Sequence, residues 1–193
     1  VPRITDVHTM AGVLESLGAH VSFQDHSLVI KVNSLQGHTP EHLVKSMRAS
    51  VQVMGPLLAR LGWVEVALPG GCAIGRRPLD IHLSGLQRMG ASIELNGERL
   101  LARAPWGLRG ADITFRYPSV GATENIMMAA VLARGETVIR NAAREPEIAD
   151  IQAFLNAMGA RVEGAGTAVI RVRGVAELGS ADHTVMPDRI EAG

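Results

Sequence analysis

Three segments of the chain share one pattern of apolar residues, in which helical spacing gives way to alternation. The related stretches LESLGAHVSF, LQRMGASIEL and LNAMGARVEG begin at Leu14, Leu86 and Leu155. In each, apolar residues three and four apart predict a helix, and the alternating residues that follow predict a strand. A glycine stands between the two and suits a helix C-terminus, because glycine adopts positive φ without strain. These glycines are Gly18, Gly90 and Gly159. The recurrence predicts three copies of one structural unit.

A second helix is predicted in the first two units, from Met47 to Leu61 and from Val120 to Ala133, each followed by a glycine and a strand. The unit therefore reads helix, two strands, loop, helix, strand, and this alternation predicts an α/β fold. At the same spacing, the second helix of the third unit would lie beyond Gly193. We therefore expect an incomplete third unit and a chain that is a fragment of a longer protein.

No low-complexity segment or flexible linker divides the chain. We expect one substrate-binding domain over residues 1–187, built of repeats at about 1–70, 71–142 and 143–187. Residues 188–193 are expected to begin a crossover to a second domain that this chain does not contain.

Composition narrows the classes of partner. The 193 residues are 47% hydrophobic, with 19 Lys and Arg against 19 Asp and Glu, so no net charge favours nucleic acid or an anionic membrane. The longest apolar run, Ile126 to Ala133, is too short to cross a bilayer. The lone cysteine cannot form an internal disulfide, which is typical of a reducing compartment, and Cys and His residues show no metal-ligand spacing. We expect no metal and no cofactor.

The segment LPGGCAIGRRPLDIHL, residues 68–83, carries the candidate chemistry. Three glycines around Cys72 allow close backbone approach to a ligand, and the following helix N-terminus presents N–H donors to an anion. Arg76 and Arg77 add positive charge, which favours the reactive thiolate of a neighbouring cysteine. The alternative is that Cys72 is a small buried hydrophobic residue and that the two arginines are simply solvated.

This loop, together with the motifs KSMRAS, PSVGATENIMMAA, NAAREPEI and PDRIEAG, resembles the UDP-N-acetylglucosamine enolpyruvyl transferases over nearly the whole chain. The resemblance implies transfer of the enolpyruvyl group of phosphoenolpyruvate to the 3-hydroxyl of UDP-N-acetylglucosamine, with release of phosphate. This is the first committed step of peptidoglycan synthesis, so it implies roles in cell wall biogenesis, cell shape and cell division. The enolpyruvyl transferase of the shikimate pathway and a non-catalytic nucleotide-sugar-binding module remain alternatives.

The resemblance further implies a cytoplasmic enzyme inhibited by fosfomycin, with neither nucleic acid nor membrane as a partner. Its domains are inside-out α/β barrels in which three βαβ-type units surround buried helices, and the active site lies between two such domains. A Ser-Lys-Asn motif that binds phosphoenolpyruvate and the entire second domain are absent from this chain. We therefore expect about half of the active site here and no activity from the fragment alone.

Roles are carried over by motif. Cys72 would add covalently to phosphoenolpyruvate or protonate its methylene carbon, and both roles need a thiol that exchanges protons readily. Arg77 would clamp phosphate or carboxylate through its planar guanidinium. Arg48 would serve the nucleotide sugar or phosphoenolpyruvate, or else be a surface residue.

Two further segments are expected to bind the nucleotide sugar. Residues Pro78, Leu79, Asp80 and Ile81 would follow Arg77 around its uracil and ribose end, although Asp80 could instead cap a helix. Ser119, Val120 and Gly121 would offer N–H groups and a hydroxyl to the diphosphate at a helix start. Thr123 is expected to pack or cap, and His82 to be a hydrogen-bonded helical histidine that could orient a neighbour.

Overall fold

The computed structural model describes residues 1–39, 43, 48–67 and 79–188. Its helices and strands are α1 (Thr5–Ser16), β1 (Ala19–Gln24), β2 (Ser27–Val32), η1 (Arg48–Val53), α3 (Met54–Leu61), β3 (Trp63–Ala67), α4 (Asp80–Arg88), β4 (Ser92–Asn96), β5 (Arg99–Arg103), β6 (Asp112–Thr114), α5 (Val120–Ala130), β7 (Glu136–Arg140), α6 (Pro146–Ala157), β8 (Arg161–Glu163) and β9 (Val169–Arg173). The predicted α/β class is confirmed.

The glycines predicted to end helices do so. Gly18, Gly90 and Gly159 come directly after the C-cap residues of α1, α4 and α6 and have φ of 99°, 96° and 97°. A residue with a Cβ is strained in this left-handed region, so glycine stops the helix and turns the chain into the next strand. An antiparallel hairpin follows each of these helices, formed by β1 and β2, by β4 and β5, and by β8 and β9.

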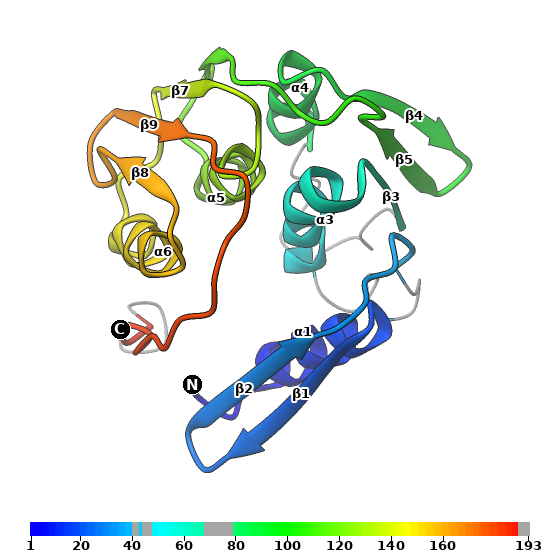
Figure 1. Ribbon diagram of the computed structural model, residues 1–193, viewed down its shortest axis with the longest axis vertical. Helices are drawn as coiled ribbons and strands as arrows, with labels where there is room; N and C mark the ends of the chain where they lie inside the picture. Colours follow the sequence, from blue (N-terminus) through cyan, green and yellow to red (C-terminus); the bar gives the residue numbers. More distant parts are fainter. Residues whose placement is uncertain (40–42, 44–47, 68–78, 189–193) are drawn as a thin grey trace.

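The hairpins belong to three separate sheets within the described residues (Figure 1). The strand orders are β1-β2, β3-β5-β4 and β6-β7-β9-β8. Among these described strands, β6 and β7 pair in parallel and the other pairings are antiparallel. The pairings run across the repeat boundaries expected near residues 70 and 142. Strand β3 pairs with β5, and β7 pairs with β9, so each of these strands joins the hairpin of the following unit.

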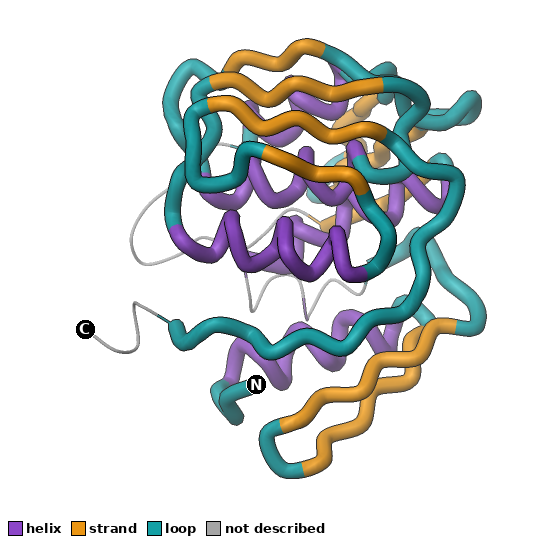
Figure 2. The backbone as a smooth tube through the Cα atoms, turned by 60° about the vertical axis from the view of Figure 1, so that its left-hand side comes forward, coloured by secondary structure: helices purple, strands orange, loops and turns teal. Residues whose placement is uncertain are grey.

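Strands lie outside and helices inside (Figure 2). Helices α3 and α5 pack against each other at the centre, and α5 also contacts α4 and α6. Met54, Leu58, Ile126 and Met127 have no exposed surface there. The core is therefore a layer of helices under the sheets, and the ends of these helices are held at fixed relative positions.

The first predicted second helix is not uniform. The helix expected from Met47 to Leu61 is divided in two over the described residues, since residues 48–53 form the 3₁₀-helix η1 and Met54–Leu61 is α-helical. Pro56 explains the break. It has no N–H for the carbonyl of Gln52, four residues earlier, and its ring would clash with that carbonyl in a continuous α-helix.

Candidate functional site

The structure describes only some of the predicted site residues. Cys72, Arg77 and Pro78 lie outside the described residues. The backbone of Arg48 belongs to η1, and its side chain also lies outside the described part of the chain. The roles expected of these four residues stay predictions. The geometry of the candidate site therefore rests on the starts of α4 and α5.

Ser119 begins α5 as its N-cap. Its backbone is extended, with φ of −132° and ψ of 116°, and its Oγ accepts a hydrogen bond of 3.4 Å from the N–H of Ala122. Thr123 stabilises the same turn, since its buried hydroxyl donates to the Ser119 carbonyl at 2.8 Å and accepts from the Ala143 N–H at 3.1 Å. The cap leaves the first-turn N–H groups, including those of Val120 and Gly121, without carbonyl partners inside the helix. An anion is favoured at this position.

Asp80 is the first residue of α4, and it does not cap the helix. The N-cap is Leu79, which makes no side-chain cap bond. Asp80 instead forms an ion pair with Arg116, which lies three residues before Ser119. Its Oδ1 is buried and has no hydrogen-bond partner among the described residues. Ile81 is only 6% exposed and packs in the core, so any contact it makes with a ligand has to come from its backbone.

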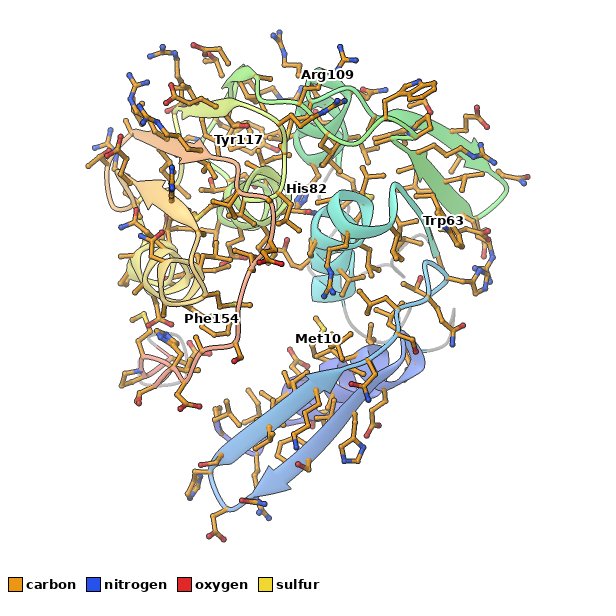
Figure 3. All side chains as sticks on the ribbon, viewed as in Figure 1. Met10, Trp63, His82, Arg109, Tyr117 and Phe154 are labelled. Carbon is orange, nitrogen blue, oxygen red and sulfur yellow. The ribbon has the colours of Figure 1, made fainter. Side chains whose placement is uncertain are left out.

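The starts of α4 and α5 meet at His82 and Gly121. A Cβ placed on Gly121 would lie 3.4 Å from His82 Cε1 and 3.6 Å from Nε2. Figure 3 shows the His82 side chain in the space between α5 and α3. The predicted residues Asp80 and Ser119–Gly121, far apart in sequence, are therefore brought together by the fold.

A buried amide holds this junction. Asn125, on α5, has no exposed surface and bonds to three groups from three other elements. Its Oδ1 accepts from the Gly55 N–H at 2.8 Å, and its Nδ2 lies 3.2 Å from the Val51 carbonyl and 3.1 Å from His82 Nδ1. The expectation that His82 is hydrogen-bonded is confirmed. Asn125 thus joins η1, the helix segment that carries Arg48, to the starts of α3 and α4.

A partly buried carboxyl, that of Glu124, lies on the residue before Asn125. Gln52 donates a hydrogen bond of 2.7 Å from its Nε2 to Oε2 of Glu124. Burial, and to a smaller extent the negative charge of Glu147, raises the pKa of Glu124 from an ordinary 4.5 to about 7. Near neutral pH this side chain is therefore divided between its acid and its carboxylate.

Gln52, Glu124 and Asn125 were not predicted from the sequence. The sequence did contain a signal for two of them. Glu124 and Asn125 are polar residues in an otherwise apolar helical stretch, a pattern that indicates buried polar contacts. Their partners come from η1, whose position relative to α5 no sequence pattern indicates.

Among the described residues, no group of three or more His, Cys, Asp or Glu side chains is arranged to hold a metal ion. Within the same part of the chain, no helix has the length and apolarity needed to span a membrane.

Comparison with known proteins identifies the family. The model of the EPSP synthase (3-phosphoshikimate 1-carboxyvinyltransferase) family matches residues 1–193. The chain is 54% identical to UDP-N-acetylglucosamine 1-carboxyvinyltransferase 2 of Carboxydothermus hydrogenoformans, covering all of this chain and 46% of that protein. It is 55% identical to UDP-N-acetylglucosamine 1-carboxyvinyltransferase 1 of Symbiobacterium thermophilum, covering 99% of this chain and 45% of the relative. The chain thus spans about half the length of these curated relatives.

Solved structures share the fold. The enolpyruvyl transferase NikO of Streptomyces tendae superposes with a TM-score of 0.82 at 19% identity, over 99% of this chain and 46% of that one. EPSP synthase of Acinetobacter baumannii gives a TM-score of 0.68, also at 19% identity, over 89% of this chain and 40% of its own. At this identity the likeness concerns the fold alone. The match of the family model to every residue, together with relatives more than half identical over the chain, shows that this chain belongs to the EPSP synthase family of carboxyvinyltransferases.

Proposed function

We propose that the protein to which this chain belongs transfers the enolpyruvyl group of phosphoenolpyruvate to the 3-hydroxyl of UDP-N-acetylglucosamine and releases phosphate. The observation that carries the proposal is the identity of 51–55% to proteins named UDP-N-acetylglucosamine 1-carboxyvinyltransferase, extending over essentially the whole chain. The shikimate-type alternative is less favoured, because the EPSP synthase structures are only 19% identical.

The geometry of the described residues supports binding of the nucleotide sugar at the starts of α4 and α5. Ser119, Val120 and Gly121 present the positive end of α5 to the diphosphate. The start of α4 would hold the uridine end, with Asp80 accepting a hydrogen bond and the neighbouring residues Pro78, Leu79 and Ile81 contributing backbone groups. The ion pair between Asp80 and Arg116 supports this assignment, since it fixes the carboxylate beside the start of α5.

The chemical roles are assigned to side chains outside the described part of the chain. Cys72 would add to phosphoenolpyruvate or protonate its methylene carbon, Arg77 would hold its phosphate or carboxylate, and Arg48 would bind one of the two substrates. Transfer also requires the second domain of the longer protein, because orientation across a closing site supplies much of the rate. We therefore propose that the 193-residue chain alone is inactive.

The larger setting follows from the same proposal. The protein would act in the cytoplasm in peptidoglycan synthesis. The three helix–hairpin units would enclose the central helices as an inside-out α/β barrel, within one domain that extends to about residue 187.

Phosphate release from phosphoenolpyruvate by the full-length protein tests the reaction. Release should depend on UDP-N-acetylglucosamine and should not occur with shikimate 3-phosphate. Release with shikimate 3-phosphate alone would favour the shikimate-type enzyme. Binding of the nucleotide sugar in calorimetry without turnover would favour the non-catalytic module.

Mass measurement tests Cys72. We expect fosfomycin to add one covalent adduct to the intact full-length protein, faster with UDP-N-acetylglucosamine present, and none to Cys72→Ser. An unmodified wild type, or equal adducts on both proteins, would refute the assignment of Cys72.

A further inference from the structure

The orientation of the buried Asn125 amide is determined by two backbone groups. Its carbonyl oxygen faces the Gly55 N–H at 2.8 Å, and its NH₂ group faces the Val51 carbonyl at 3.2 Å. Rotating the amide by half a turn would place two donors together and two acceptors together. Both repulsions would arise in a site without exposed surface, where unpaired polar groups are costly.

This orientation settles which ring nitrogen of His82 carries the proton. The same NH₂ group of Asn125 lies 3.1 Å from His82 Nδ1. Because the amide presents a donor, Nδ1 has to be the acceptor, and a neutral imidazole then carries its proton on Nε2. The tautomer thus follows from backbone groups on η1 and α3.

The protonated nitrogen lies against the first turn of α5. A Cβ on Gly121 would lie 3.6 Å from Nε2, so this edge of the ring borders the N–H groups behind the Ser119 cap. A donor at this point adds to a site that already favours an anion.

We infer that Asn125 is a positioning residue that holds His82 as its Nε2–H tautomer, so that the ring donates a hydrogen bond to the anionic group bound at the start of α5. The inference rests on the proposed function, in which this group is the diphosphate of a nucleotide sugar. Asn125 makes no contact with substrate and acts through His82.

Nuclear magnetic resonance tests the tautomer directly. Full-length protein labelled with ¹⁵N-histidine gives two-bond correlations that separate a protonated ring nitrogen from an unprotonated one, and loss of signal in His82→Phe identifies the residue. We expect a protonated Nε2 and an unprotonated Nδ1 in the ligand-free protein. A proton on Nδ1 would overturn the inference, and this measurement requires no variant of Asn125 to fold.

Kinetics test the consequence. Asn125→Asp keeps the acceptor for Gly55 but turns a carboxylate oxygen toward His82, which draws the ring proton onto Nδ1. The matched control is Asn156→Asp, because Asn156 also bridges a backbone carbonyl and N–H, those of Val162, at 2.8 and 2.9 Å, but at a distance from the site.

Asn125→Asp should raise KM for UDP-N-acetylglucosamine about tenfold or more relative to Asn156→Asp, with a smaller change in kcat. Loss of a hydrogen bond to a charged group produces an effect of this size, since the tenfold change corresponds to about 1.4 kcal/mol. In a His82→Phe background, Asn125→Asp should change KM by no more than about twofold, because the histidine through which Asn125 acts is already absent.

Equal KM values in Asn125→Asp and Asn156→Asp, or an undiminished effect in the His82→Phe background, would refute the positioning role. Failure of the proposed function is distinguishable. In that case the wild type would not turn over UDP-N-acetylglucosamine, while the Nε2–H tautomer would still be observed.

Discussion

Glu124 should make the stability of the protein depend on pH in the direction opposite to that of a salt-bridged carboxylate. Burial and the Glu147 charge raise its pKa to about 7, whereas an unfolded chain would titrate near 4.5. The folded state therefore holds the proton more tightly than the unfolded state. The perturbation that isolates this effect is Glu124→Gln, which removes the titration and keeps an acceptor for the Gln52 amide.

The sign and size follow from linkage. Below pH 4.5 the Glu124 carboxyl is protonated in both the folded and the unfolded state, so the folded state does not have to bury a negative charge. As the pH rises toward 7, only the unfolded chain ionises freely, so the free energy of unfolding falls, and above 7 the loss is complete. A shift from 4.5 to about 7 corresponds to about 3 kcal/mol at 1.36 kcal/mol per unit.

Urea unfolding of the full-length protein and its variant between pH 4 and pH 8 measures this. Glu124→Gln should match the wild type at pH 4 and exceed its free energy of unfolding by up to about 3 kcal/mol at pH 8. Glu163→Gln changes the same atoms at an exposed position on β8 and serves as control. A difference between Glu124→Gln and wild type that stays constant with pH, or a variant less stable at pH 8, would refute the reasoning.

Three glycine substitutions give graded expectations. Gly55→Ala should lower the free energy of unfolding by about 3 kcal/mol or more, because its Cβ would lie 2.4 Å from the backbone oxygen of Asn125 and force α3 and α5 apart. Gly85→Ala should cost less, about 1 kcal/mol, since its Cβ would meet the movable end of Ile126 at 2.6 Å and alanine favours the helix; equal losses in urea unfolding would contradict this ranking. Gly121→Ala should change stability by less than about 1 kcal/mol, because its Cβ would come nearest, at 3.1 Å, to Nε2 at the far end of the Gln52 side chain and not to backbone. It should nevertheless raise KM for UDP-N-acetylglucosamine in steady-state assays, and an unchanged KM would place the nucleotide sugar elsewhere.

Local chemistry made much of the fold predictable. The three helix ends were found because a glycine in the left-handed region needs no tertiary partner to stop a helix. The start of α5 at Ser119 could likewise be predicted from the sequence, since a serine N-cap bonds to N–H groups within its own turn. By contrast, the 3₁₀ segment before Met54 was missed because the apolar pattern was followed without the effect of Pro56.

The α/β class, the repeated helix and hairpin, and the motifs that indicate an enolpyruvyl transferase could all be predicted from the sequence, because they depend on residues close together along the chain. The folded arrangement was needed to show that β3 and β7 join the hairpins that follow them, and that Asn125 contacts both Val51 and His82. The physical reason is that sheet pairing and buried hydrogen bonds depend on which helix ends meet in the core. Residues 51, 82 and 125 are separated by tens of positions, so no local periodicity records their contact.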